Sequence, residues 1–434
     1  MRRLLAYGLF VFWGILAGAA GPHYDWPFPT VAGKKGLQVQ MVNDALALGV
    51  QHAALNLNLS QLVDLGGSTN NLAWSADGRV FRFHSGYVRS LDAQVKPLSD
   101  AGVVVSIIVL AYATGQPAID SVMLHPNYRR DSPNHLGAFN NRTPEGRAWF
   151  SAAMEFLADR WSRPDQRHGR VANWIIGNEV NSHWFWANCG RTSLEAFTDD
   201  YVEVMRLAHD AVRRQSANSR VYVSLEHHWN IRYPGGDAGQ AFPGRPFLER
   251  FAATARDGGD FAWHVAFHPY PENLFEPRTW RDKSATMEVL TTPRITFKNL
   301  ELLPAFLGRK EFLHAGQPRR IILSEQGFHT PDGPDGENLQ AAAYCYAMRK
   351  VARLPGVDSF ILHRHVDHGQ EGGLRLGLWT RDPAGSHPAQ PLRMKRIYEV
   401  FQATGTPGET EAYAFALPII GWTNWSPMSR DFPP

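Results

Sequence analysis

An apolar run that stops abruptly on a carboxylate constrains the fold of this chain most. Residues 174–181 read Trp-Ile-Ile-Gly-Asn-Glu-Val-Asn, and the apolar run at 171–176 is too short for a helix. Short strands that are apolar throughout are typical of parallel sheets covered on both faces. Such a strand would place Glu179 at its carboxyl end, where α/β barrels carry their functional side chains.

A second stretch has the same form and ends on Glu325. Residues 319–327 read Arg-Arg-Ile-Ile-Leu-Ser-Glu-Gln-Gly, a short apolar run followed by a glycine that permits a sharp turn. Side chains alternate along a strand, so each Glu should share a side with the residues two and four positions before it. Those sets are Ile175, Gly177 and Glu179 in one strand, and Ile321, Leu323 and Glu325 in the other.

If these two sides face a barrel axis, the carboxylates of Glu179 and Glu325 converge. Two carboxylates that flank a glycosidic bond are what glycoside hydrolysis needs, one to protonate the leaving oxygen and one to attack or to activate water. The alternative is that one Glu belongs to a structural ion pair, since a buried carboxylate is costly unless it is paired or used.

Strand and helix patterns alternate along the whole chain. Further strands are expected at 50–57, 103–110, 220–225, 261–268 and 357–363, and helices at 37–48, 87–101, 143–161, 194–208 and 341–354. This alternation predicts an α/β fold, a (β/α)8 TIM barrel with long loops at its C-terminal face, including an irregular segment at 111–141. The first barrel strand lacks a clear pattern, and we expect it within residues 27–36.

Smaller signals mark turns and helix starts. An Ala-Asp-Gly turn within 70–84 predicts a hairpin. Thr143 and Pro144 have the form of a helix cap and first position, and Thr192 to Glu195 matches a capping box.

The 434 residues fit one barrel of about 250 residues with insertions. Residues 1–20 begin Met-Arg-Arg, continue as an apolar stretch and end in small residues, which predicts a signal peptide and a secreted or periplasmic protein. A retained membrane anchor is the alternative. We expect a catalytic domain at 21–403, a C-terminal tail packed on the barrel at 404–434, and no membrane contact after cleavage of the signal peptide.

Composition narrows the partners. A net charge of +3 is too small to argue for nucleic acid, whereas 14 Trp suit the apolar faces of sugars as well as they suit a core. Cys189 and Cys345 could pair in an oxidising compartment or remain two buried thiols, and the oligomeric state stays open.

Polar and aromatic side chains follow most of the predicted strand ends, as expected for a carbohydrate site that needs no cofactor and no metal. The candidate substrate-binding residues are Asn56, Asn178, Trp184, Glu226, His228, Trp229, His268, Tyr270, His363 and His365.

The histidines at the last strand allow a rival hypothesis. His363, His365 and Asp367 could hold a metal, because histidines two apart share a strand face, which would make the protein a metal-dependent hydrolase. The familiar His-x-His barrel site lies on the first strand, where nothing resembles it, so sugar-hydroxyl binding is the favoured use. A non-catalytic carbohydrate-binding barrel is the other alternative, and the presence of both carboxylates argues against it.

The order of these motifs resembles clan A of the retaining glycoside hydrolases, with family 39 as the nearest likeness. The strings Gly-Asn-Glu-Val-Asn, Ala-Phe-His-Pro-Tyr-Pro-Glu, Leu-Ser-Glu-Gln-Gly-Phe and His-Arg-His-Val-Asp-His resemble domain-of-unknown-function family 5722, over residues 36–396. The resemblance implies a retaining glycoside hydrolase that works by double displacement, with Glu179 as acid/base and Glu325 as nucleophile.

The resemblance also implies roles around these carboxylates. Asn178 would donate to the sugar 2-hydroxyl, and Tyr270 or His268 would be the partner of the nucleophile. The chain departs from the clan at Gly177, where many members carry Trp, and at the last strand, which ends in histidines where an aromatic platform is common.

Overall fold

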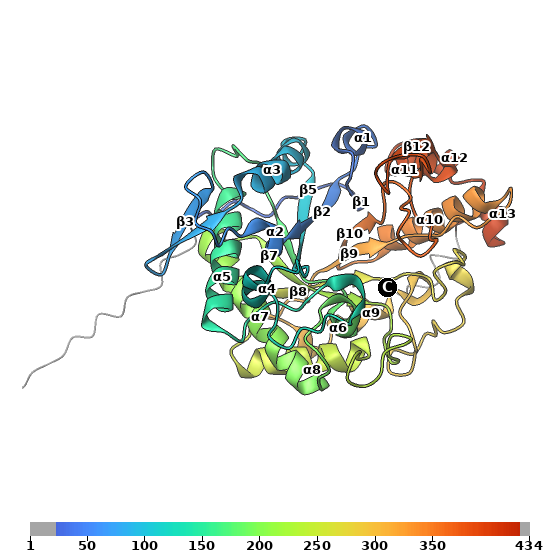
Figure 1. The fold of residues 1–434 in the computed structure, drawn as a ribbon. Coiled ribbons are helices and arrows are strands. Elements are labelled where there is room, and N and C mark those ends of the chain that lie inside the picture. The colour runs from blue at the N-terminus through green and yellow to red at the C-terminus, as the bar shows by residue number, and fades with distance from the viewer. Residues whose placement is uncertain (1–22, 426–434) are drawn as a thin grey trace, which may run out of the picture.

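Eight parallel strands close into a barrel in the computed structural model, which describes residues 23–425 (Figure 1). Each strand pairs with the next along the chain, and the last pairs with the first, in the order β1-β2-β5-β6-β7-β8-β9-β10. The strands are β1 Lys35–Gln38, β2 His52–Asn58, β5 Val104–Leu110, β6 Asn173–Ile176, β7 Arg220–Glu226, β8 Trp263–His268, β9 Ile321–Gln326 and β10 Val357–Leu362. The predicted (β/α)8 fold class is therefore confirmed.

A helix follows each strand and covers the outside of the barrel (Figure 1). These helices are α1 Val42–Ala47, α3 Ser85–Asp100, α5 Pro144–Arg160, α7 Leu194–Gln215, α8 Gly244–Asp257, α9 Leu302–Leu307, α10 Gly336–Arg353 and α11 Arg396–Ala403. The expected cap at Thr143 is present, since its side chain accepts from the Gly146 amide. For α7 the cap is Ser193, one residue after the predicted Thr192, and it accepts from the Ala196 amide.

The loops carry shorter elements. The predicted hairpin is β3 Leu72–Ala76 with β4 Arg79–Phe83, and a second hairpin pairs β11 Trp379–Arg381 with β12 Pro391–Met394. The short helices are α2 Leu59–Leu62, α4 Pro117–Met123, α6 His183–Trp186, α12 Glu409–Ala412 and α13 Ala416–Ile420. Single 3-10 turns lie at Pro133–His135, Val180–Ser182, Thr279–Arg281, Phe297–Asn299 and Lys310–Phe312. The segment 111–141, expected to be irregular, thus contains one short helix and one such turn.

The first strand begins later than the sequence pattern indicated. It occupies Lys35–Gln38, so the helix expected from residue 37 starts only at Val42. Gly36 allows close packing here, because a β-carbon at this position would meet His52 and Ile361 at 2.9 Å. A strand of four residues is too short to show a period of its own.

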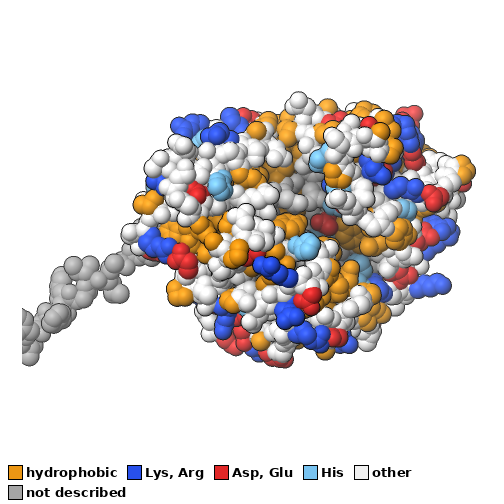
Figure 2. All heavy atoms as spheres, viewed as in Figure 1, with side chains coloured by type: hydrophobic (Ala, Val, Ile, Leu, Met, Phe, Trp, Pro, Cys, Tyr) orange, Lys and Arg blue, Asp and Glu red, His pale blue; other side chains and the backbone are white. Residues whose placement is uncertain are grey.

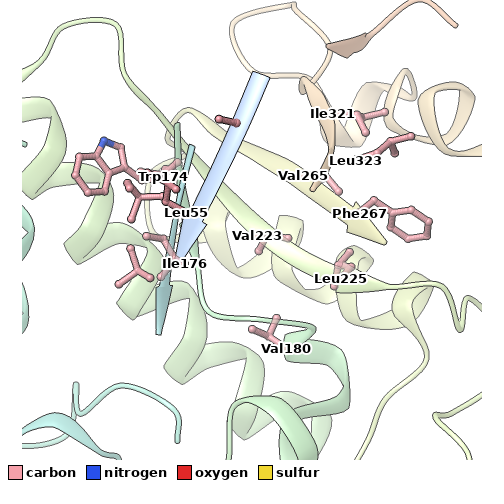
Figure 3. Packing of buried hydrophobic residues seen from close by; sticks show 14 of the residues in the cluster. Leu55, Trp174, Ile176, Val180, Val223, Leu225, Val265, Phe267, Ile321 and Leu323 are labelled. Atoms are coloured by element: carbon pink, nitrogen blue, oxygen red, sulfur yellow. The ribbon is translucent and has the colours of Figure 1, made fainter. Parts of the chain in front are cut away.

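Apolar side chains form two layers, one inside the barrel and one between strands and helices. The inner layer contains Ala54, Ile108, Leu110, Ile175, Tyr222, Ala266, Ile322 and Ile361. Figure 3 shows part of the outer layer, in which Ile176, Val223 and Val265 come from successive strands.

The alternation predicted for β9 was wrong at two positions. Ile321 and Leu323 lie in the outer layer, and Ile322 points inside. Glu325 nevertheless reaches the inside because β9 has a bulge: Leu323 pairs with Phe360 and Gln326 with Leu362, which leaves one extra residue on β9. An extra residue reverses the alternation of the side chains that follow.

The segment after α11 returns to the outside of the barrel, where α13 packs on α10. Cys189 and Cys345 are both buried and unpaired. Within residues 23–425, every helix is too short or too polar to span a lipid bilayer. The predicted signal peptide at 1–20 and the last residues of the tail, 426–434, lie outside the described residues.

Candidate active site

Glu179 is presented by a tight turn after β6. The strand ends at Ile176, and the chain then passes through Gly177 at φ +87° and Glu179 at φ +41°, both in the left-handed region. Glycine adopts this conformation readily, whereas for Glu it is strained and must be held by the surroundings. The Glu179 amide donates to Ser224 Oγ of β7 at 3.0 Å, which helps to hold the turn.

Two neighbouring residues after β8 contact the two carboxylates. His268 Nδ1 lies 2.9 Å from Glu179 Oε1, and its Nε2 lies 3.0 Å from Ser324 Oγ. Tyr270 donates its hydroxyl to Glu325 Oε1 at 3.1 Å. The end of β8 therefore connects the turn after β6 with the end of β9.

The carboxylates converge as the sequence predicted. One oxygen of Glu179, one oxygen of Glu325 and one ring nitrogen of His268 lie within 4.8 Å of one another. Glu179 and His268 are buried, and Glu325 is half-buried. One carboxylate is thus shielded from water while the other faces the opening of the barrel.

The surroundings raise the pKa values of three groups at this site. Burial raises the pKa of Glu179, and the negative charges of Glu325 and Glu226 raise it further, against the opposing effect of His268. Burial alone would lower the pKa of His268, but the hydrogen bond to Glu179 and the charge of Glu325 outweigh burial and raise it. Burial and the charge of Glu325 also raise the pKa of Tyr270, so its hydroxyl stays protonated and can donate.

Aromatic side chains from the loops after β5, β6 and β7 approach the carboxylates. Tyr112 and Trp186 pack against the inner layer of the barrel, where it opens. Burial and the charge of Glu325 raise the pKa of Tyr112, and burial and the charge of Glu179 raise that of Tyr233. Trp184, the predicted sugar contact, is half-buried and does not belong to this layer. Tyr112 and Tyr233 lie in irregular segments, so no period in the sequence pointed to them.

A polar chain joins the ends of β1, β2 and β10 at the opening. Gln38 donates to Asn56 Oδ1 at 3.2 Å and its Oε1 contacts His363 Nδ1, while His363 Nε2 lies 3.0 Å from Glu371 Oε1. Arg364 donates to the same Glu371 oxygen. Burial would raise the pKa of Glu371, but these two partners lower it to about 2, so it is ionised at neutral pH. The sequence missed Gln38 because it ends the unpatterned first strand.

Several predicted residues remain open to solvent. Asn56 is exposed and Asn178 is half-buried, and within residues 23–425 the Asn178 side chain makes no hydrogen bond. Figure 2 shows a hollow near the middle of one face of the molecule, where acidic and histidine side chains gather among uncharged ones.

Two predicted binding residues, Trp229 and His365, serve the fold instead. Trp229 is fully buried, packs edge-on against Phe306 and donates to the Val289 carbonyl, so the prediction of a sugar contact was wrong. His365 is also fully buried: its Nδ1 accepts from the backbone of the β1–α1 connection, and its Nε2 lies 2.8 Å from Asp44 Oδ2.

Glu226 and His228, which were also predicted to bind substrate, form a buried hydrogen-bonded pair with each other. Glu226 Oε2 lies 2.5 Å from His228 Nδ1, and Oε1 accepts from Asn181 Nδ2 at 2.7 Å and from Ser182 Oγ at 3.0 Å. Both oxygens are therefore occupied by protein groups. They tie the turn that carries Glu179 to the end of β7.

The metal hypothesis for the last strand was also wrong. His363 binds Glu371 and Gln38, His365 binds Asp44, and Asp367 accepts from the buried Lys395 ammonium at 2.8 Å. The three side chains thus point to different partners. Among the described residues, the groups that bring three potential metal ligands within 4.8 Å are Glu226-His227-His228 and Glu179-His268-Glu325.

Fold and site together define a (β/α)8 barrel with one carboxylate just after its fourth strand and its partner at the end of its seventh strand. The chain belongs to the family of unknown function DUF5722, whose model matches residues 27–428. No curated protein matches the sequence.

Solved structures of glycoside hydrolases share the fold at low sequence identity. A family 39 glycoside hydrolase from Bacteroides cellulosilyticus WH2 aligns with a TM-score of 0.52 at 12% identity, over 90% of this chain and 64% of that chain. This chain therefore spans less than two thirds of that protein. A β-glucosidase from Pyrococcus furiosus aligns with a TM-score of 0.50 at 15% identity, over 93% and 99% of the two chains. The β-glycosidase BGL167 aligns with a TM-score of 0.50 at 16% identity, over 83% and 84%.

Proposed function

We propose that this protein is a retaining glycoside hydrolase that acts on a poly- or oligosaccharide, with Glu179 as acid/base and Glu325 as nucleophile. The spacing of the two carboxylates supports this most directly, because an oxygen of each lies within 4.8 Å of the other. Retaining enzymes hold the two carboxyl groups about 5 to 5.5 Å apart, whereas inverting enzymes need about 6.5 to 9.5 Å for a water molecule.

In the first step, Glu325 attacks the anomeric carbon and the bond to the leaving oxygen breaks as Glu179 protonates that oxygen. Tyr270 holds the attacking carboxylate in place through its hydrogen bond to Oε1. Burial of Glu179 beside negative neighbours favours the protonated acid that this step requires.

In the second step, Glu179 is ionised and takes a proton from water, which displaces Glu325 and releases a sugar of the original anomeric configuration. His268 contacts Glu179 Oε1 throughout and orients it between the two roles. Asn178 would bind a sugar hydroxyl next to the acid, and the absence of a hydrogen-bond partner for its side chain among the described residues supports this role.

The test is hydrolysis of a panel of 4-nitrophenyl α- and β-glycosides of common pyranoses and of soluble polysaccharides. We expect release of nitrophenol or reducing ends by the wild type and loss of release in Glu179→Gln and Glu325→Gln. Glu411→Gln, an exposed carboxylate on α12, is the control. A matching 2-deoxy-2-fluoro glycoside should label Glu325, which mass spectrometry of the peptide would detect.

A barrel that binds carbohydrate without cleaving it is the alternative. It predicts binding of a polysaccharide in affinity electrophoresis, no turnover on any glycoside, and equal binding by wild type and Glu325→Gln. Turnover that requires both carboxylates would exclude it.

We also propose that the protein is secreted or periplasmic, from the sequence of residues 1–20, and cell fractionation would test this.

A further inference from the structure

We propose that the ring of Phe275 stacks on a sugar unit next to the unit attacked by Glu325, so that the substrate is bound through at least two units on that side of the cleaved bond. This inference rests on the proposed glycosidase function. Phe275 lies in the connection between β8 and α9 and is 51% exposed. Among the described residues, it is the one aromatic side chain among the large exposed hydrophobics.

The Phe275 ring is supported on the side that faces the protein. The His329 ring meets it edge-on, with centroids 5.1 Å apart and planes at 66°. His329 is itself buried, and its Nδ1 accepts from the Arg375 amide at 3.1 Å. The Phe275 amide donates to Asn273 Oδ1 at 3.0 Å, which fixes the turn. A ring that is both fixed and exposed loses little entropy when a ligand stacks on it.

The neighbouring loop leaves space beside the ring. Gly372 and Gly373 follow one another there, and a β-carbon at 373 would already lie 4.0 Å from Phe275 Cε1. At 372 a β-carbon would meet nothing within 4 Å. A larger side chain at 373 would therefore contact the ring, and the glycine leaves that part of the ring uncovered.

A short series of contacts connects the ring with the nucleophile. Gly373 follows Glu371 by two residues, and Glu371 contacts His363 at the opening of the barrel. The ring also contacts His329, four residues after Glu325, and follows Tyr270, which donates to Glu325, by five residues. Phe275 therefore lies beside the ends of β8 and β9, the strands that bring Tyr270 and Glu325 together, where the sugar that becomes attached to the enzyme would extend.

The chemistry of the ring fits this occupant. An aromatic face packs against the apolar face of a pyranose, and removing both from water is favourable. The other strongly exposed apolar side chains are not aromatic: Val80 and Leu392 lie on the two hairpins, and Met287 and Leu290 lie in the connection that carries Phe275.

The experiment compares 4-nitrophenyl glycosides of one, two and three units of the sugar that the wild type cleaves. All share one leaving group, so only the Glu325 side lengthens along the series. We expect the wild type to show a higher kcat/KM for the longer glycosides, and Phe275→Ala to lower the ratio of trimer to monomer by about tenfold. The lower kcat/KM of Phe275→Ala on the longer glycosides should come mainly from a higher KM.

Three variants separate stacking from packing. Phe275→Trp should keep the wild-type ratio of kcat/KM between trimer and monomer, because it keeps an aromatic face. Phe275→Leu should lose it, although it covers His329 with an apolar side chain. Leu392→Ala on β12, which is 61% exposed, should behave as the wild type.

Failure of the inference and failure of the proposed function are distinguishable. If the wild type cleaves no glycoside of the panel, the proposed function fails and the inference falls with it. If it cleaves the monomer glycoside but shows no gain with length, or a gain that persists in Phe275→Ala, the glycosidase stands and the stacking site is refuted.

Discussion

His268 Nδ1 lies 2.9 Å from Glu179 Oε1, and this contact joins the end of β8 to the strained turn after β6. Two residues further along, Tyr270 reaches Glu325. Residues at the end of a single strand, β8, thus support both carboxylates at the opening. Each of the two contacts has a separate chemical consequence that can be measured.

The two carboxylates should differ in their dependence on the leaving group. Glu325→Gln should lower kcat by at least about 10,000-fold for every glycoside, because the attacking group is lost. Glu179→Gln should cost about 100- to 10,000-fold with an alkyl leaving group and far less with 2,4-dinitrophenol, which departs without a proton. Kinetics on both types of glycoside check this, and equal losses in the two variants would contradict the assigned roles.

Removal of the Tyr270 hydroxyl should weaken the nucleophile without unfolding the barrel. Tyr270→Phe keeps the ring and deletes the donor to Glu325 Oε1. Hydrogen bonds to charged groups contribute about 1.5 to 3 kcal/mol, so kcat should fall about 10- to 100-fold. Steady-state kinetics and a thermal melt would show this, and a large drop in Tm with unchanged kcat would indicate a purely structural role.

The pH profile should report the raised pKa of Glu179. Burial and nearby negative charge raise it above the ordinary value of 4.5, and the acid works only while protonated. The alkaline limb of kcat/KM should therefore lie above pH 4.5, with activity falling as pH rises through the raised pKa. With 2,4-dinitrophenyl glycosides this limb should fade, since no proton is needed. If the alkaline limb does not change with the leaving group, it reports the titration of a residue other than Glu179.

Acid should destabilise the fold through buried neutral histidines. Burial lowers the pKa of His52 to about 4 and those of His183 and His227 to about 3. Below pH 6.5 the unfolded chain binds protons that the folded chain rejects, so stability falls as pH drops, by about 1.4 kcal/mol per unit for each histidine. Urea unfolding at pH 7, 5.5 and 4.5 measures this. His183→Phe should reduce the slope, and an unchanged slope would exclude its contribution.

Chelation should leave activity intact. His365 and Asp367 are bound to Asp44 and Lys395, so neither is free to hold an ion needed for hydrolysis. Glycosidase activity measured after dialysis against EDTA should equal the untreated activity. Its loss, with recovery on addition of a divalent cation, would direct attention to the Glu179-His268-Glu325 cluster.

Much of the fold followed from local pattern. The apolar runs before Glu179 and Glu325 were short and continuous, and both proved to be buried parallel strands, because burial on two faces leaves that signature in the sequence. The cap at Thr143 was equally local. The first strand was misplaced because Lys35–Gln38 is too short to carry a period.

The sequence by itself determined the barrel and the pair of carboxylates, since strand signatures and residue types are properties of neighbouring positions. Only the tertiary structure decided which candidates reach the opening. The β9 bulge turned Glu325 inward, burial removed Trp229, and distant partners occupied Glu226 and His365. These outcomes depend on contacts between residues far apart in the chain, and no local pattern records such contacts.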